Sequence, residues 1–505
     1  MIWTSLEAKE IDRLSSEVYG IPSLTLMEDA GLKTYQYALQ QWKPYFHFVV
    51  LAGGGNNGGD ALVVARLLFE AKFPVDCFDL SEGKETAERR HQRLLLEKTG
   101  CPLRSFVPSS LTAYRHDLII IDGLLGIGLK GPLRPGLVRD CLIEAQSIKP
   151  RVVIAIDLPS GLDADAWEQP APPLLATHTI TFGEKKAVHV VAPSRQFCGH
   201  IMLARLTFAK EAIAKVMAMR DLSYVHTEKS SSLAELWRFL PKDAHKYDRG
   251  HVLAIGGSPG KVGAILMAAE AALKAGAGWV SVAPMSEIFA PAWTREFTYE
   301  SFALEGVIDA RALSDFVLKR RVKAILIGPG TMDNPLTHDV LAALSALQKK
   351  QTLRLIFDAG ALSNLFSLAK GLRFDPEHTL LTPHPGEWAR LDSQEPLSAP
   401  ARVSDLSHVI ARLQRFGFSA IFKSASPIIL APGRCIFLSL GDNRLARAGS
   451  GDVLAGLILG LAPTPHNLHE LSALAQNMLA RSSLRSEASL SPLENLKHLD
   501  NFKQE

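Results

Sequence analysis

A glycine-rich loop, Gly53 to Gly59, is the first stretch whose residue types could do chemistry. The pattern Gly53-x-Gly55-x-x-Gly58 follows the apolar run FHFVVLA and opens the helical pattern ALVVARLLFEAK. Unpaired N–H groups and the dipole at a helix N-terminus favour an anion there. Asp79 closes the next apolar run about 20 residues on, which is the spacing of a dinucleotide fingerprint. A turn alone would not need five glycines in seven residues, so the loop predicts a phosphate site, with NAD-dependent hydride transfer as the first hypothesis.

Asp60 conflicts with this hypothesis. We expect it in the first turn of the following helix, close to where a pyrophosphate would rest. Two like charges at short range repel by roughly 1 kcal/mol or more. Asn56 and Asn57 supply amide oxygens, and hard cations prefer oxygen ligands. The loop therefore indicates a cation-assisted site rather than a grip on a hydride carrier.

Acidic residues also follow two later strand patterns. Asp122 ends the run DLIIID, Asp157 ends RVVIAID, and Ser160 lies in the turn after Asp157. Gly126–Pro132 forms a second flexible loop after Asp122. Any one of these acids alone could equally be a helix N-cap. Together with Asp60 they are in register at the ends of successive strands, which indicates a functional edge, because a lone buried carboxylate is costly.

The stretch ARAGSGDVLAGLILG, Ala446–Gly460, is the corresponding feature of the second half. Gly449 and Gly451 flank Ser450, and Asp452 stands at the start of an apolar helix pattern. The N–H groups of such a turn can form a nest for phosphate or for a developing oxyanion. Asp452 can remove a proton from a hydroxyl as general base. An Asp N-cap with glycines for the turn is the structural alternative, and the pattern as a whole favours catalysis.

Three further patterns of the second half carry candidate residues. LLTPHPGEWARL places His384 in a rigid Pro-His-Pro turn, where a substrate contact is favoured over the surface or core role that a lone histidine usually has. Lys423 ends a predicted strand, where it can meet a nucleotide phosphate or simply be solvated. LIGPG, with Gly328 and Gly330, ends another strand and could be only a turn.

The elements that must position these residues alternate between short strands and helices. From Phe46 to about Phe182, and again from GHVLAIGG onward, nearly continuous apolar runs are separated by helical patterns. This alternation predicts parallel sheets covered on both faces, so the fold class is α/β. A polar stretch predicts a linker at 221–235 between domains 1–220 and 236–505. The tail after about Ser486 is expected to fray.

The composition narrows the class of protein further. A chain of 505 residues fits two to four domains at about 100–200 residues each. A net charge of +3 gives no reason to expect a nucleic-acid or membrane partner. Five separated cysteines without a CxxC pair predict neither disulfides nor a zinc site and favour a reducing cytoplasm. We expect no signal peptide, and no uncharged apolar run reaches the about 18 residues of a membrane helix.

The first half resembles a known family. PSLTLMEDAG, GGGNNGGDALVVARLL, DGLLGIGLKGP and IDLPSGLDAD together are similar to the NAD(P)H-hydrate epimerase domain, up to about residue 215. The resemblance implies a Rossmann-like three-layer α/β/α domain and potassium bound by Asn57, Asp122 and Ser160. It implies that hydrated nicotinamide nucleotide is bound by Asn56, Asn57, Gly58, Gly59, Asp60, Gly126, Ile127, Gly128, Leu129, Lys130, Gly131, Pro132 and Asp157. Ala61 stands where the family usually has glycine, and a methyl group in the first helical turn should be tolerated.

The second half resembles the ADP- or ATP-dependent NAD(P)H-hydrate dehydratase, over roughly Leu236 to Leu484. GHVLAIGGSPGKVGAILMAAEAALKAGAG, GPG, TPHPGEWARL and AGSGDVLAG carry the match and imply a ribokinase-like α/β/α domain. The resemblance implies substrate contacts at Ala264, Gly330, His384 and Asp452. It implies adenine-nucleotide contacts at Lys423, Ser424, Ala425, Ser426, Pro427 and Gly451.

Three departures fall on the nucleotide side of this domain. Gly360 stands where the family usually has a second aspartate, and Ser424 stands where the lysine is usually followed by glycine. GDNRLARAGSGD lacks the usual Asn-Pro-Gly and carries Arg444 and Arg447 instead. These arginines could contact phosphate or mark an altered activity.

Together the two resemblances imply a bifunctional repair enzyme for NADH and NADPH hydrates. The second domain would phosphorylate the ring hydroxyl of the S epimer from ADP or ATP with Mg2+, and phosphate would then leave. Asp452 is the expected base. The first domain would interconvert the R and S epimers, with either Asp157 or Asp60 as its acid–base group. A ribokinase-like kinase for a small hydroxylated substrate, and a first half serving as a non-catalytic binding module, are the alternatives. We expect small-molecule partners only, and a homo-oligomer.

Overall fold

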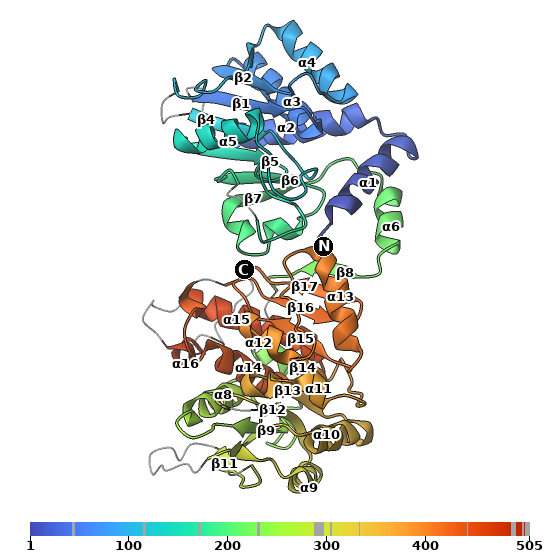
Figure 1. Ribbon diagram of the computed structural model, residues 1–505, viewed down its shortest axis with the longest axis vertical. Helices are drawn as coiled ribbons and strands as arrows, with labels where there is room; N and C mark the ends of the chain where they lie inside the picture. The colour runs from blue at the N-terminus through green and yellow to red at the C-terminus, as the bar shows by residue number, and fades with distance from the viewer. Residues whose placement is uncertain are drawn as a thin grey trace. The chain divides into compact units, whose positions relative to one another are not determined.

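The computed structural model describes residues 1–42, 46–114, 118–169, 173–229, 233–286, 297–303, 306–332, 334–441, 443–485, 491–496 and 499. The chain divides into two compact units, Met1–Tyr224 with Ala401–Ser404, and Val225–Pro400 with Asp405–Glu505 (Figure 1). The segment 221–235, predicted as a linker, contains β8 (Ser223–His226) and most of α7 (Leu233–Leu236), and its residues 230–232 lie outside the described part. Most of the tail that we expect to fray also lies outside it. The predicted domain limits stay predictions.

The first unit is built on a parallel sheet. Its described strands lie in the order β3-β2-β1-β4-β5-β6-β7, and every neighbouring pair runs parallel. The strands are β1 (His47–Gly53), β2 (Val75–Leu80), β3 (Leu103–Ser105), β4 (Leu118–Gly123), β5 (Val152–Ile156), β6 (His178–Phe182) and β7 (His200–Ala204). The helices are α1 (Ser5–Glu17), α2 (Ser23–Gln41), α3 (Asn56–Glu70), α4 (Ala87–Thr99), α5 (Leu137–Ser147) and α6 (Lys210–Ala218), with short 3-10 helices η1 (Ala187–His189) and η2 (Ser194–Phe197).

Helices cover both faces of this sheet. Phe48 and Val50 of β1 pack in a hydrophobic cluster with residues of α2 and α3. Their neighbours Val49 and Leu51 pack in a second cluster with residues of α5. Successive side chains of a strand point to opposite faces, so the two clusters are the two faces. Each fully buried valine, leucine or phenylalanine contributes roughly 1.5–3 kcal/mol, which explains why the strands are apolar throughout.

The second unit contains a larger sheet. Its described strands lie in the order β11-β10-β9-β12-β13-β14-β15-β16-β17-β8, parallel from β11 to β15 and antiparallel for β15–β16 and β16–β17. Besides β8, the strands are β9 (His251–Gly256), β10 (Trp279–Pro284), β11 (Phe297–Tyr299), β12 (Val322–Ile327), β13 (Arg354–Phe357), β14 (Thr379–Leu381), β15 (Ser419–Phe422), β16 (Ile428–Ala431) and β17 (Arg434–Phe437).

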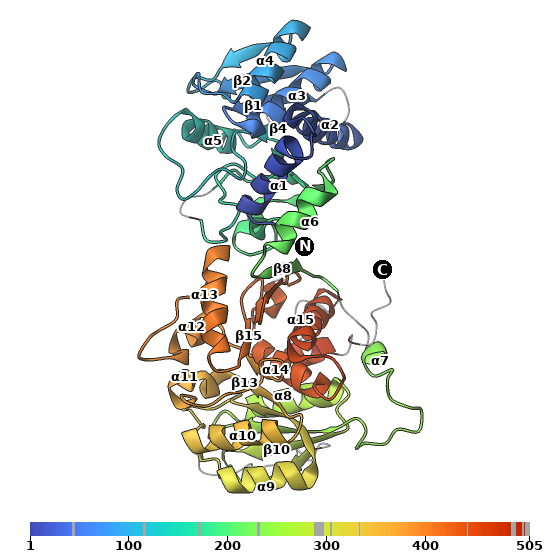
Figure 2. The same ribbon diagram turned by 90° about the vertical axis from the view of Figure 1, so that its right-hand side faces the viewer.

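The helices of the second unit pack around this sheet. Besides α7, they are α8 (Val262–Lys274), α9 (Ala310–Arg320), α10 (His338–Lys350), α11 (Leu365–Leu368), α12 (Pro385–Trp388), α13 (Val403–Gln414), α14 (Ser450–Leu461), α15 (Leu468–Arg485) and α16 (Pro492–Asn495), with 3-10 helices η4 (Ala359–Leu362), η5 (Ala389–Leu391) and η6 (Asn443–Leu445). Figure 2 shows α8, α14 and α15 side by side, and their apolar residues share one cluster with Val252 and Ala254 of β9. The α/β class predicted from the sequence is confirmed in both units.

The strand order marks one crevice in each sheet. In the first sheet, β2 lies on one side of β1 and β4 on the other, and in the second sheet β10 and β12 flank β9 in the same way. Connections from such neighbouring strands diverge, and ligands bind at the carboxyl ends of the strands where they do. We therefore expect binding sites at the loops after β1 and β4, and after β9 and β12.

Candidate active sites

The glycine loop after β1 lies at the first of these crevices. Two glycines allow the chain to pass there: a Cβ on Gly53 would lie 1.9 Å from the Leu124 carbonyl oxygen, and a Cβ on Gly58 would lie 1.9 Å from the Gly53 carbonyl oxygen. Helix α3 begins at Asn56, so Asp60 is its fifth residue and Ala61 its sixth. The prediction that Asp60 and Ala61 lie in the first turn is wrong, because extended Gly55 is the N-cap and the asparagines open the helix.

A cavity of about 590 Å³ opens beside this loop. The predicted substrate residues that line it are Asn56, Asn57, Asp60, Gly126, Ile127, Gly128, Leu129 and Asp157. The predicted residues that do not line it are Gly58, Gly59, Lys130, Gly131 and Pro132. The ammonium of Lys130 lies 2.8 Å from a carboxylate oxygen of Asp165 and 3.4 Å from one of Asp163, so its charge is used in ion pairs. The two glycines of α3 instead pack inside the unit.

Asp157 is held as a carboxylate at the edge of the cavity. Lys186 donates to its Oδ1 at 2.6 Å, and the Thr181 hydroxyl donates to the same oxygen at 2.9 Å. Burial alone raises the pKa of Asp157, but the attraction of Lys186 outweighs it, so the pKa lies below its usual value. Burial and nearby Lys186 lower the pKa of His189 to about 3, so its neutral ring donates from Nε2 to the Asp157 carbonyl, 2.9 Å away.

The pKa of Asp60 is shifted in the opposite direction from that of Asp157. Burial raises its pKa well above the usual value, and repulsion from Asp157 and Asp12 adds to the rise. Asp60 and Asp157 both line the cavity. Two carboxyl groups whose surroundings push their pKa values apart are typical of an acid and a base that share one site. The structure thus distinguishes two residues that the sequence left as equivalent candidates.

Several cavity residues were not predicted from the sequence. Lys186 and Asp12 are charged, and Trp3, Phe182 and Phe208 form part of an apolar wall. The available signal for Asp12 is an acid placed between Ile11 and Leu14, two buried apolar residues of α1. Lys186 follows β6 in the same way that the predicted acids follow β4 and β5. The further unpredicted residues of the lining are Ala8, Lys9, Ser23, Leu26, Met27, Ala30, Gly54, Gly55, Thr86, Leu124, Leu125, Val138 and Leu206.

Asn57, Asp122 and Ser160 meet next to the cavity. The Ser160 hydroxyl donates to Asp122 at 2.6 Å, and the Asn57 amide donates to the Leu125 carbonyl at 3.1 Å. The Ser160 oxygen also lies 3.2 Å from that carbonyl. Burial raises the pKa of Asp122, and hydrogen bonds from Ser160 oppose the rise. The oxygens of a carboxylate, a hydroxyl and a carbonyl gather here beside the Asn57 amide, and oxygens are the donors that a hard cation prefers, so the set fits potassium.

In the second unit, the loops after β9 and β12 also lie together. Gly330 has φ +69°, and a Cβ there would lie 3.1 Å from the Cβ of Ala264 at the start of α8. The Ser258 N–H donates to the Gly330 carbonyl at 3.0 Å. The two predicted substrate residues Ala264 and Gly330 are therefore neighbours, as the switch of strand order between β9 and β12 requires.

Asp452 lies in a cluster of buried charges. The Lys423 ammonium is 2.7 Å from Asp358 and 3.8 Å from Glu387, and a Cβ on Gly451 would lie 3.4 Å from it. Burial raises the pKa of Asp452 to about 6; repulsion from Asp358 adds to the rise and Lys423 opposes it. The residue is therefore ionised at neutral pH yet close to its titration point, which suits a general base.

The remaining predicted residues surround this cluster unevenly. His384 lies 3.4 Å from Glu387, and the Lys423 N–H donates to the Pro383 carbonyl at 2.8 Å, so the Pro-His-Pro turn adjoins Lys423. Asp358 pairs with the Lys423 ammonium, and the nucleotide contact of Lys423 stays a prediction. Ser424 and Ser426 bond each other within the turn that also holds Ala425 and Pro427.

The departures from the family pattern have different surroundings. Gly360 is part of η4, and Arg444 donates to the Leu484 carbonyl at 3.2 Å. Asp442 lies outside the described residues, and Arg447 is exposed beside the GSGD turn.

The GSGD turn contains a buried hydroxyl without a partner among the described residues. Gly449 has φ +90° and caps α14, whose first residues are Ser450, Gly451 and Asp452. Within the described part of the chain, nothing hydrogen-bonds the buried Ser450 hydroxyl. A buried polar atom without a partner normally marks a missing ligand or water. The Ser450 N–H donates to the Arg447 carbonyl at 3.3 Å, so the groups that fit a bound phosphoryl are the Ser450 hydroxyl and the N–H groups of Gly451 and Asp452.

Comparison with known proteins decides the family. The family model described as NAD(P)H-hydrate dehydratase matches residues 252–503, and the model described as YjeF-related protein N-terminus matches residues 23–188. The bifunctional NAD(P)H-hydrate repair enzyme Nnr of Moorella thermoacetica is 33% identical over 482 residues, which cover 91% of this chain and 87% of that protein. The chain belongs to the bifunctional NAD(P)H-hydrate repair enzyme family.

The chain is similar to a second curated protein and to a solved structure. The enzyme of the same name from Escherichia coli is 30% identical over 476 residues, 92% of this chain and 86% of that protein. The solved ADP/ATP-dependent NAD(P)H-hydrate dehydratase of Bacillus subtilis, co-crystallised with ATP and Mg2+, is 25% identical with a TM-score of 0.41, over 54% of this chain and 95% of that one. The family predicted from the motifs is confirmed over both halves. None of the helices in the described residues has the length and apolar character to cross a membrane.

Proposed function

We propose that this chain repairs hydrated NADH and NADPH: the first unit interconverts the R and S epimers, and the second dehydrates the S epimer with ADP or ATP. The observation that carries the proposal is that each unit places a carboxylate with a raised pKa, Asp60 or Asp452, beside a glycine turn at the carboxyl edge of its sheet. The family assignment favours this function over a simple kinase joined to a non-catalytic module.

The epimerase step follows from the two oppositely titrating acids. Neutral Asp60 gives its proton to the hydroxyl on carbon 6, the C–O bond breaks, and the ring nitrogen lone pair forms the C=N bond as water leaves. Water then adds to the other face of carbon 6 and Asp157 takes its proton. Lys186 keeps Asp157 ionised for this role, and solvent restores both groups.

The dehydratase step follows from the GSGD turn. Asp452 removes the proton of the ring hydroxyl, whose oxygen attacks the terminal phosphoryl group of the nucleotide. The bond from that phosphorus to the bridging oxygen breaks, and AMP leaves from ADP, or ADP from ATP. The Ser450 hydroxyl and the N–H groups of Gly451 and Asp452 hold that phosphoryl group. The C–O bond then breaks, phosphate leaves, and loss of a ring proton from carbon 5 gives the reduced nicotinamide. Mg2+, which in such sites is bound largely through substrate phosphates, would offset their charge.

The direct test is recovery of NADH from its hydrate. Purified protein is mixed with an R/S mixture of NADH hydrate, Mg2+ and either ADP or ATP, and the absorbance of reduced nicotinamide is followed together with free phosphate. We expect full recovery and one phosphate per NADH formed. Accumulation of a stable phosphorylated ring without phosphate release would instead establish a kinase and overturn the proposal.

The pH profile of dehydration should follow Asp452. Because Asp452 acts as base only when ionised and its pKa is about 6, the dehydratase kcat should fall as the pH drops through about 6. Lys423→Met removes the positive charge that opposes protonation, so the acid limb should move to higher pH. Asp358→Asn removes a negative charge and should move it to lower pH.

A matched control is Lys349→Met, an exposed lysine in the last turn of α10, which should leave the profile unchanged. The charged groups around Asp452 are Asp358, Lys423 and Glu387, with His384 beyond Glu387. If the Lys423 and Asp358 variants move the limb in the same direction, the cluster does not set the titration of Asp452.

Potassium should stabilise the first unit. Asn57, Asp122 and Ser160 would hold it, and its charge would offset the buried carboxylate and the substrate phosphates. Replacing K+ by tetramethylammonium at equal ionic strength should lower the melting temperature and the epimerase rate. Saturation at about 100 times the Kd corresponds to about 2.7 kcal/mol. Asp122→Asn should abolish the K+ response, while exposed Asp140→Asn should keep it. A K+ response that survives in Asp122→Asn would place the ion elsewhere.

We also propose that the chain acts in the cytoplasm as a homo-oligomer. Light scattering coupled to size exclusion would give the oligomeric state directly, and a monomeric mass at micromolar concentration would contradict it.

A further inference from the structure

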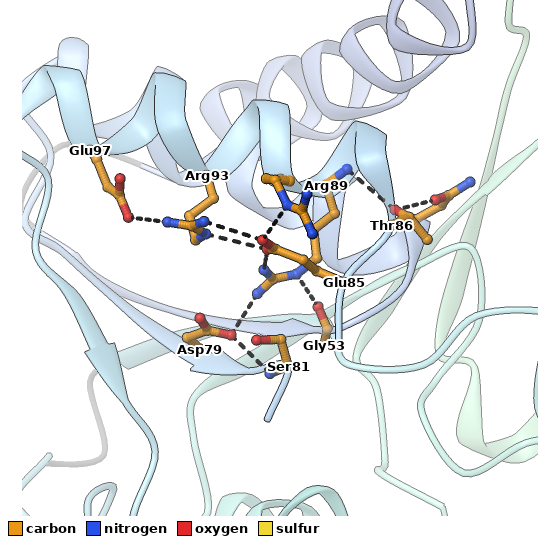
Figure 3. A network of polar contacts seen from close by, with 10 residues as sticks. Gly53, Asp79, Ser81, Glu85, Thr86, Arg89, Arg93 and Glu97 are labelled. Atoms are coloured by element: carbon orange, nitrogen blue, oxygen red, sulfur yellow. Dashed lines mark hydrogen bonds and ion pairs between the residues drawn. The ribbon is translucent and has the colours of Figure 1, made fainter. Parts of the chain in front are cut away.

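Arg89 of α4 lies fully buried directly beneath the glycine loop. Its guanidinium donates at 2.6 Å to each of three acceptors: the Gly53 carbonyl, Asp79 and Glu85 (Figure 3). A buried arginine is costly unless its donors are matched, and the planar fork matches these three acceptors at once. The side chain therefore ties the end of β1, the end of β2 and the start of α4 to one another.

The N-terminus of α4 holds the glycine loop at two further points. The Thr86 N–H donates to the Gly54 carbonyl at 3.3 Å, and the Thr86 hydroxyl donates to the Asn56 side chain at 2.8 Å. Thr86 is also the N-cap of α4, where its hydroxyl accepts from the Arg89 N–H. Gly54, Asn56 and Thr86 line the cavity of the first unit. The loop that faces the ligand is thus anchored by α4 as well as by its own helix α3.

The contact between Arg89 and Asp79 involves the acid of the dinucleotide fingerprint found in the sequence. In that fingerprint, the acid at the end of the second strand binds a ribose hydroxyl. Here Asp79 occupies that position, but its Oδ1 accepts from both Arg89 and the Ser81 N–H. Glu85 joins the pair from the other side (Figure 3). One carboxylate oxygen of the acid that would bind the ribose of a hydride-carrying dinucleotide is thus already bound within the protein.

We propose that Arg89 is a positioning residue of the epimerase site, which fixes the glycine loop through the Gly53 carbonyl and withdraws Asp79 from ribose binding. This inference rests on the proposed function. It concerns Arg89 itself, which the motifs of the family resemblance do not include. Without the guanidinium, the Gly53 carbonyl loses a hydrogen bond, and Asp79 and Glu85 lose the buried cation between them. The loop should then be less well positioned, so substrate binding should weaken more than the chemical step.

The test compares substitutions along α4 in the full chain. Arg89→Met should raise the epimerase KM about tenfold or more with a smaller change in kcat, since a displacement of about 1 Å in a positioning element can cost up to about 100-fold. Arg89→Lys, which keeps the charge but reaches fewer acceptors, should give an intermediate KM. Arg93→Met is the matched control, because Arg93 lies one turn later, pairs with Glu85 and Glu97, and does not contact the loop.

The dehydratase of the same chain monitors folding and concentration, and its KM and kcat should stay within about twofold of wild type in every variant. If Arg89→Met unfolds the first unit, Thr86→Val decides, since it keeps the guanidinium, removes the bond to Asn56 together with the N-cap bond from the Arg89 N–H, and should raise the epimerase KM. An epimerase KM within twofold of that of Arg93→Met, in folded protein, overturns the inference. A wild-type chain without epimerase activity would instead contradict the proposed function, so the two failures are distinguishable.

Discussion

Asp452→Asn should lower the dehydratase kcat by roughly 10²–10⁴-fold, the usual contribution of a general base. The asparagine keeps the size of the side chain and the helix start but cannot take the hydroxyl proton. The substitution also removes a buried negative charge that Asp358 and Glu387 repel, so the free energy of unfolding should not decrease. The measurement is single-turnover recovery of NADH from the S epimer with saturating ADP or ATP.

The control for this experiment lies within the same chain. Epimerisation of the R and S hydrates, followed by separating the two epimers, should proceed in Asp452→Asn at the wild-type rate. Unchanged NADH recovery in the variant would remove Asp452 from the mechanism. Loss of both activities together would indicate unfolding rather than chemistry.

Asp157→Asn should lower the epimerase kcat by a similar factor, roughly 10²–10⁴-fold. The variant loses its base, and Lys186 is left buried beside a neutral amide. With an R/S mixture of NADH hydrate, rapid recovery should stop when the S fraction is consumed, because the R epimer has no route to the dehydratase. In Asp60→Asn, recovery of NADH should stop at the same point, since this substitution removes the proton donor.

The epimerase rate of the wild type should depend on the protonation of both acids. In wild type, epimerisation requires neutral Asp60, so the rate should fall as the pH rises above the raised pKa of Asp60. It should also fall at low pH, where Asp157 becomes protonated. If Asp157→Asn leaves epimerisation intact, the first unit is a binding module and not an enzyme.

The sequence was sufficient for features that follow from strand order. Asn56, Gly126 and Asp157 meet at one cavity because loops at the carboxyl ends of adjacent parallel strands converge, and the apolar runs identified those strands. In the second unit, the same reasoning brings Ala264 and Gly330 together. Alternating apolar strands and helices therefore predict where a site lies with little other information.

The sequence did not predict the ion-pair partners of long charged side chains. Lys130 belongs to a loop that lines the cavity, yet its ammonium pairs with Asp163 and Asp165. Lys423 ends a strand, and its ammonium pairs with Asp358, a partner that the sequence did not indicate. Spacing along the chain does not show which of several nearby acids a flexible lysine reaches, because that depends on packing between distant segments. For the same reason Asp12, from the first helix, could not be placed beside Asp60.

The backbone of Asp157 has a consequence for evolution of the first unit. Its φ of +65° places a non-glycine residue in the left-handed region, at a cost of order 1–3 kcal/mol. Glycine would adopt this conformation without that cost, so Asp157→Gly should melt at a higher temperature than Asp157→Asn while both are inactive. The retained aspartate means that the epimerase half gives up thermal robustness for chemistry, and a copy released from selection for epimerisation would be expected to drift toward glycine at this position.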